Sequence, residues 1–210
     1  MSAYAIDELL ARRPELSVCA ASIEAAHCIL RDSYAAGGKV LVCGNGGSAA
    51  DSEHIVGELM KKFKRPRPVP PAIAGRLRPE LASRLEGALP AVSLVSMCGL
   101  ITAFANDVAW ETAFAQLALG LARPGDVLVA LSTSGNSANC VAAAEVVKAV
   151  GGKAVAFTGW RESRLSAVCD VAIRVPEDET FKIQELHLPV YHAICAALED
   201  DFFGGDAGGR

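Results

Sequence analysis

The stretch KVLVCGNGGSAADSEH (residues 39–54) combines three signals that together decide the fold. KVLVC is a short apolar run with β-branched members, which predicts a buried strand. A glycine-rich turn follows and opens a segment with helical spacing. The stretch VLVALSTSGNSANC (residues 127–140) repeats this order of strand, small polar turn and helix. Two such units predict parallel strands covered by helices.

Strands and helices alternate along the rest of the chain, which predicts the α/β class. We expect a three-layer αβα sandwich with a five-stranded parallel sheet, preceded by N-terminal helices. Residues 1–203 are expected to form one domain, with an insertion at about residues 65–90 and a disordered tail at 204–210. The other expected strands are 91–95, 153–158 and 171–175, and the main expected helices are 15–36, 49–64, 100–122, 139–150, 162–168 and 180–198.

Composition narrows the class of protein. The 210 residues are 51% hydrophobic and 6% aromatic, with a formal charge of −4 and a mean hydropathy of +0.29. This apolar content excludes a disordered chain, and the charge argues against a nucleic-acid partner bound through a basic face. The apolar excess is high for a lone soluble domain, so it leaves a membrane segment or a large subunit interface to be weighed.

Residues 87–106 are the candidate membrane segment, because they carry no charged residue. They contain Pro90, Ser93, Ser96 and Gly99, and no basic residue anchors their ends, so a strand, a turn and a helix fit better than a membrane span. Seven cysteines are scattered without a C-x-x-C pair, and the N-terminal residues lack a signal-peptide core. We therefore expect a cytoplasmic protein with no membrane partner.

The two polar turns predict a phosphate site. Ligands of open parallel sheets bind at the carboxyl ends of strands, where a turn that opens a helix presents free N–H groups and the positive end of the helix dipole. The second turn adds the hydroxyl groups of Ser132, Thr133, Ser134 and Ser137. The alternative is that both turns are simple helix caps.

Nucleotide binding is disfavoured at the first turn. It lacks the lysine of nucleoside-triphosphate loops. Gly44-x-Gly46-x-x-Ala49 fits the loose dinucleotide fingerprint, but the chain continues with Lys61-Lys-Phe-Lys-Arg65 and prolines where a second strand ending in an acidic residue is needed. We expect no nucleotide cofactor.

Acid–base side chains gather on two predicted helices. His54 and Glu58 are four residues apart on the helix that follows the first turn, so they share a face. Gln184, His187 and His192 lie on the last helix. Such a set suits proton transfer next to a sugar carbonyl, or a divalent metal with nitrogen and oxygen ligands. The alternatives are a solvated helix face for Glu58 and core or interface roles for the histidines.

These motifs resemble the sugar isomerase (SIS) domain family and, within it, the phosphoheptose isomerase group. The resemblance rests on CGNGGSAADSEH (43–54), AND (105–107), RPGDVLVALSTSGNSANC (123–140), TG (158–159) and IRVP…IQELHLPVYH (173–192). It implies a flavodoxin-like αβα fold and a homotetramer with its sites at subunit interfaces. In such a tetramer the first long helix and the last are expected to bury apolar stripes against other subunits.

The resemblance also implies an activity, the aldose–ketose isomerisation of a phosphosugar such as sedoheptulose 7-phosphate through an enediol. Glu58 and His192 match the acid–base pair of the isomerases. The implied phosphate ligands are Ser132, Thr133, Ser134 and Ser137, and the residues that line the sugar are Asn45, Gly46, Gly47 and Ser48, with Gln184. Some members hold Zn²⁺ at positions matching His54, Glu58, Gln184 and His192.

Two departures from the group's pattern concern the substrate. Met97 stands where the isomerases usually carry an aspartate that contacts substrate, and the segment at 65–90 is longer than usual. The alternative function is a non-catalytic phosphosugar-binding or regulatory protein similar to the relatives that associate with a replication initiator. Those relatives lack the helix glutamate and the last-helix histidine, so Glu58 and His192 favour the enzyme.

Overall fold

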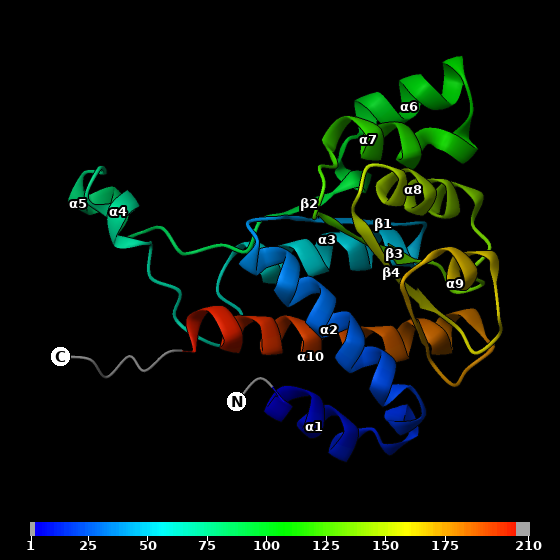
Figure 1. Cartoon of the computed structure of the whole chain (residues 1–210), viewed down its shortest axis with the longest axis horizontal. Helices are drawn as coiled ribbons and strands as arrows, with labels where there is room; N and C mark the ends of the chain where they lie inside the picture. Colours follow the sequence, from blue (N-terminus) through cyan, green and yellow to red (C-terminus); the bar gives the residue numbers. More distant parts are fainter. Residues whose placement is uncertain (1–2, 205–210) are drawn as a thin grey trace.

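The computed structural model describes residues 3–204, and a sheet of five parallel strands lies at its centre (Figure 1). The strands are β1 (Val40–Gly44), β2 (Ala91–Ser93), β3 (Val127–Leu131), β4 (Lys153–Thr158) and β5 (Val171–Arg174). Their order, β2-β1-β3-β4-β5, is the flavodoxin-like order. Gly44 pairs with Leu131, so the turns after β1 and β3 start side by side. The predicted fold class is confirmed.

Helices cover both faces of the sheet. Val40 and Val42 of β1 pack in one buried cluster, whereas Leu41 and Cys43 pack in another on the opposite face. Successive strand residues point to opposite faces, so a strand that is apolar throughout requires a helical layer on each side. The first face carries α2 (Ala20–Ala35), α3 (Gly47–Met60) and α10 (Thr180–Phe203), and the second carries α7 (Ala113–Leu121), α8 (Ala138–Ala149) and α9 (Arg164–Val168).

The N-terminal segment forms α1 (Ala3–Arg12) and a 3-10 helix, η1 (Pro14–Cys19), before α2. Ala5 of α1 is buried against Ala196 and Ala197 of α10, so α1 packs on the side of α10 that faces away from the sheet (Figure 1). The predicted helix at 15–36 therefore begins as a 3-10 helix, and the helical conformation continues into α2.

The apolar stripes of α2 and α10 pack within one chain. Ile23 and Leu30 of α2, and Val190 and Ile194 of α10, lie in the buried cluster on the sheet. The prediction that these stripes cover other subunits is therefore wrong, because the sheet of the same chain already buries them. The exposed large apolar side chains include Phe181 and Leu188 on another part of the α10 surface, and Tyr4, Val18 and Leu119 on other elements.

The segment predicted as one helix over residues 100–122 is interrupted. It forms α6 (Cys98–Asp107), a 3-10 helix, η3 (Trp110–Thr112), and α7. The interruption is at Val108, whose φ of −128° and ψ of −80° are not helical. Asn106, Asp107 and Val108 are all poor helix formers, because short polar side chains compete for the backbone and branched ones lose rotamer freedom.

Smaller differences lie at element ends. β2 is shorter than the predicted strand at 91–95, because the chain turns into a 3-10 helix, η2 (Leu94–Ser96). α3 ends at Met60, before the predicted residue 64, because Lys61 is extended. α10 continues past the predicted residue 198 to Phe203. Gly204 follows α10, and the rest of the predicted tail at 204–210 lies outside the described residues.

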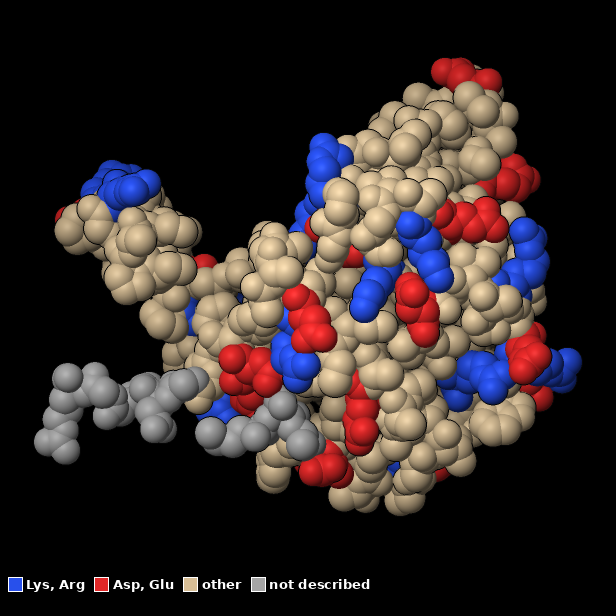
Figure 2. All heavy atoms as spheres, viewed as in Figure 1, with Lys and Arg blue, Asp and Glu red and all other residues tan. Residues whose placement is uncertain are grey.

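Residues 65–90, predicted as an insertion, project from the domain, and we call this segment the arm (Figure 1). The arm holds two one-turn helices, α4 (Pro71–Ala74) and α5 (Pro79–Ala82). Basic side chains gather at its tip (Figure 2), where Arg76 and Arg78 are exposed. Within residues 3–204, no helix combines the length and apolar character needed to cross a membrane.

Candidate active site

The turn between β1 and α3 places the first group of predicted residues. Gly46 has φ of +58°, a conformation that favours glycine, and it lets α3 begin at Gly47. Gly47 lies against α10, where a Cβ atom would be 2.5 Å from Gln184 Nε2. Ser48 is buried. This turn therefore brings together Gln184 and the glycines predicted to line a sugar.

Asn45, in the same turn, is held by a residue that the sequence analysis missed. Asn45 Nδ2 donates to Asn139 Oδ1 at 2.9 Å, and Asn139 Nδ2 donates to Asn45 Oδ1 at 3.0 Å. Asn139 is buried in the first turn of α8. Its position two residues after STSGNS is the signal that could have identified it, because the residues opening that helix face the neighbouring turn.

The turn between β3 and α8 forms the second group. The Ser132 and Ser137 hydroxyl oxygens are 2.9 Å apart, and Gly135 adopts φ of +65° between them. Thr133 and Ser134 line a cavity of about 340 Å³ whose other lining residues include Trp160 and Arg161. The cavity thus lies at the N-terminal end of α8, where backbone N–H groups favour an anion.

Trp160 and Arg161 are functional candidates that the sequence analysis did not single out. Arg161 pairs with Asp178 at 3.0 Å, and both side chains are exposed. Arg161 is the one cationic residue among those lining this cavity. The signal was available, since both residues directly follow the Thr158–Gly159 pair at the end of β4.

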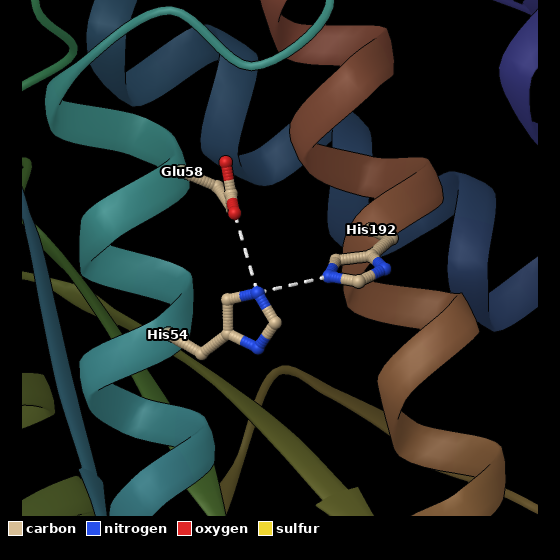
Figure 3. Close-up of side chains that lie close together, drawn as sticks. All are labelled: His54, Glu58 and His192. Atoms are coloured by element: carbon tan, nitrogen blue, oxygen red, sulfur yellow. Dashed lines mark hydrogen bonds and ion pairs between the residues drawn. The ribbon is translucent and has the colours of Figure 1, made fainter.

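Three predicted acid–base residues converge between α3 and α10 (Figure 3). His54 Nε2 lies 3.2 Å from Glu58 Oε1 and 3.2 Å from His192 Nε2. The ligand atoms of the three side chains all lie within 4.8 Å of one another. The i,i+4 spacing on α3 and one facing residue on α10 suffice to build this cluster.

A polar chain lies behind His54. The Tyr191 hydroxyl donates to Asp51 Oδ1 at 3.1 Å, and its oxygen lies 3.0 Å from His54 Nδ1. His54 Nε2 faces Glu58 and His192 in the cluster. Two imidazole nitrogens and one carboxylate oxygen, with an outer hydrogen-bond partner for a histidine, fit a zinc ion. Asp51 and Tyr191 were not singled out by the sequence analysis, although each lies close in sequence to a predicted ligand.

Burial sets the protonation of the neighbouring groups. Burial lowers the pKa of His192 below its ordinary value, and the nearby His54 lowers it further. Burial also raises the pKa of Asp51. His187 lies apart from the cluster, fully buried with Nε2 3.3 Å from the Thr158 carbonyl oxygen, so it is a core residue.

Gln184, the fourth predicted zinc ligand, lies on α10 eight residues before His192, which is about two helical turns. Within one chain the structure thus places Gln184 beside Gly47 and gathers His54, Glu58 and His192 further along the same pair of helices.

Comparison with known proteins identifies the family of this chain. The profile of the SIS domain family covers residues 8–159, which include both polar turns, His54 and Glu58. The chain belongs to the SIS domain family. This SIS domain is 39% identical over 190 residues to a phosphoheptose isomerase of Akkermansia muciniphila, and the match covers 90% of each chain.

Two solved phosphoheptose isomerases share the fold of this SIS domain. The structure from Neisseria gonorrhoeae has a TM-score of 0.70 and 31% identity, covering 95% of this chain and 93% of its own. The one from Francisella tularensis has a TM-score of 0.76 and 27% identity, covering 94% of this chain and 95% of its own. The resemblance predicted from the motifs is confirmed.

Proposed function

We propose that this SIS domain is an aldose–ketose isomerase for a phosphorylated sugar, with Glu58 and His192 as its acid–base pair. The observation that carries the proposal is the convergence of these two side chains, from different helices, on His54 Nε2 at 3.2 Å each. Its relatives among the phosphoheptose isomerases support a phosphosugar substrate.

The phosphate group is proposed to occupy the turn after β3. Ser132, Thr133, Ser134 and Ser137 offer hydroxyl groups, and the N-terminal end of α8 offers backbone N–H groups. The sugar then extends toward the neighbouring turn after β1, where Asn45, Gly46, Gly47, Ser48 and Gln184 lie. The pairing of Gly44 with Leu131 keeps these two turns adjacent.

Glu58 removes the proton from the carbon next to the carbonyl. The C–H electron pair forms the C=C bond of an enediol, and the carbonyl oxygen gains a proton. A proton then returns to the former carbonyl carbon, and the hydroxyl group on the carbon that was first deprotonated loses its proton and becomes the new carbonyl, so the isomer forms without any external oxidant. His192 transfers the protons at the two oxygens, a role that suits an imidazole whose lowered pKa keeps it neutral near pH 7.

A zinc ion is proposed as the cofactor, held by His54, Glu58 and His192 with Gln184. When bound, zinc polarises the sugar oxygens as a Lewis acid. The donor set of this chain supports the assignment, because His54 Nδ1 lies against the Tyr191 hydroxyl and Nε2 points into the cluster toward Glu58 and His192.

The substrate of this chain is proposed to make a different contact at Met97, where the isomerases usually carry an aspartate. Met97 directly precedes α6, and the nearby residues Val95 and Cys98 line an apolar cavity of about 270 Å³ together with Trp110 and Asn45. A thioether is only a weak hydrogen-bond acceptor, so Met97 binds sugar hydroxyl groups less well than an aspartate does. We therefore propose a phosphosugar that relies less on polar contacts at this end.

Assembly and location complete the proposal. We propose a homotetramer, supported by exposed apolar residues such as Tyr4, Val18 and Leu119. All seven cysteines are free thiols, which supports a reducing, cytoplasmic location.

The decisive experiment incubates the purified protein, with and without a chelator, with ketose phosphates of five to seven carbons in deuterated water. Formation of an aldose, read by NMR together with deuterium at the carbon next to the carbonyl, is the expected result. The unphosphorylated sugars are the control. Clear binding of phosphosugars without turnover would instead favour the non-catalytic function.

A further inference from the structure

A buried ion pair joins the root of the arm to α10. Arg67 Nε lies 2.7 Å from Glu199 Oε1, and the two side chains are 0% and 1% exposed. Nothing in the mechanism above uses either residue. A buried charge pair is costly to desolvate, and apolar side chains of similar volume often give equal or greater stability, so the pair calls for an explanation other than stability.

Arg67 holds the end of the helix that carries Glu58. Its Nη1 donates to the Leu59 carbonyl oxygen at 2.6 Å, and its Nη2 donates to the carbonyl oxygen of Glu58 itself at 2.9 Å. These carbonyls lie in the last turn of α3, where no helical N–H group reaches them and where the helix dipole favours a cation.

Glu199 holds the segment that follows α3. Its two carboxylate oxygens accept the backbone N–H groups of Phe63 at 2.8 Å, Lys64 at 2.7 Å and Arg65 at 2.9 Å. Together with Arg67, these bonds satisfy the buried carboxylate on both oxygens. The chain leaving α3 is therefore fixed to α10 by a fully bonded network.

Glu199 is seven residues after His192 on α10, about two helical turns, so both side chains lie on the face that meets α3. One ion pair thus joins the helix of Glu58 to the helix of His192. We propose that Arg67 and Glu199 are positioning residues that set the spacing between Glu58 and His192. This inference rests on the proposed acid–base function of that pair.

The same two segments offer a matched control. Arg65 pairs with Asp200, so it too links the root of the arm to α10. The Arg65 side chain is half exposed, and in this part of the structure it bonds neither Glu58 nor Leu59. Arg65→Met therefore removes a cross-link of the same kind without loosening the end of α3.

The test measures kcat and KM for Glu199→Gln, Arg67→Met, Arg67→Lys and Arg65→Met, with circular dichroism to confirm folding. A displacement near 1 Å can cost about 100-fold in rate, so we expect kcat to fall about 10- to 100-fold in Glu199→Gln and Arg67→Met while KM changes less than about threefold. Arg67→Lys keeps the charge and is expected to recover part of the loss, and Arg65→Met is expected to match the wild type.

Where Arg67→Met does not fold, the double variant Arg67→Met/Glu199→Gln removes the unpaired buried charge and takes its place. A folded variant with wild-type kcat, or equal losses in Arg65→Met, would overturn the positioning role. A wild-type protein that turns over no phosphosugar would overturn the proposed function, and this outcome is distinct from the first.

Discussion

Asn45 and Asn139 exchange two side-chain hydrogen bonds, at 2.9 and 3.0 Å, between the turn after β1 and the start of α8. The pair ties the proposed sugar-lining turn to the proposed phosphate turn. Each amide satisfies the other, so neither is free to rotate without leaving a buried polar group unpaired.

Replacement of Asn139 by alanine is therefore expected to weaken substrate use through Asn45. An unpaired buried amide costs about 1–3 kcal/mol, so kcat/KM should fall about tenfold or more in steady-state kinetics. Because the two residues act as a unit, Asn45→Ala/Asn139→Ala should be little worse than either single variant. Fully additive losses would contradict the coupling.

Glu58→Gln is expected to abolish most turnover while the protein stays folded. General acid–base catalysis contributes about 100- to 10,000-fold, so kcat should fall by that order while phosphosugar binding persists in calorimetry. Glu185→Gln, at an exposed position of α10, is the matched control and should keep wild-type kcat. Isomerisation by Glu58→Gln at the wild-type rate would show that another group takes the proton.

Two glycines of α3, Gly47 and Gly57, are expected to respond differently to replacement by alanine, because only Gly47 packs against another side chain. A Cβ atom at Gly47 would meet Gln184 Nε2 at 2.5 Å, whereas one at Gly57 would meet nothing within 4 Å. Gly47→Ala is expected to displace Gln184 and lower kcat/KM about tenfold or more. Gly57→Ala should keep activity and raise the free energy of unfolding by up to about 1 kcal/mol in urea melts. Equal effects of the two changes on kcat/KM would argue against a role for Gln184.

His187 makes stability depend on pH. Burial lowers its pKa to about 4 from the ordinary value of 6.5. Between these pH values the unfolded chain binds the proton and the folded chain does not, so the free energy of unfolding should fall as the pH drops from 6.5 toward 4, by up to about 3 kcal/mol. Urea titrations across this range should show a flatter dependence for His187→Gln, and an unchanged slope would assign the effect to other groups.

Zinc content tests the proposed cofactor directly. The wild-type protein is expected to retain zinc after gel filtration, as measured by plasma mass spectrometry, and to lose activity when a chelator removes it. His54→Gln should lose the metal because it removes the nitrogen that faces both Glu58 and His192. His187→Gln is the matched histidine control and should retain it. Zinc bound equally by both variants would place the ion elsewhere.

Much of this architecture could be predicted from local pattern. The five apolar runs became the five strands because buried parallel strands need continuous apolar residues, and the spacing of His54 and Glu58 was enough to place them on one face. Periodicity failed at residues 100–122, where the break at Val108 follows from individual helix propensities in an otherwise apolar segment.

The partners of the predicted residues were harder to infer, because they come from distant parts of the chain. Asn139 and Glu199 look unremarkable as neighbours in sequence, and their roles follow only once β1 meets β3 and α3 meets α10. The apolar stripes of α2 and α10 were assigned to subunit contacts for the same reason. An apolar stripe shows that a helix face is buried, but it does not show which surface covers that face.

The arm closes on itself at its root, where the Gly87 N–H group donates to the Arg67 carbonyl oxygen at 2.8 Å. The chain between these residues contributes no strand to the sheet, and lengthening a loop that is already closed costs little entropy. The exposed turn between Leu77 and Arg78 is thus a suitable insertion site for a fluorescent reporter or affinity tag, because the added residues would leave the packing of the core unchanged.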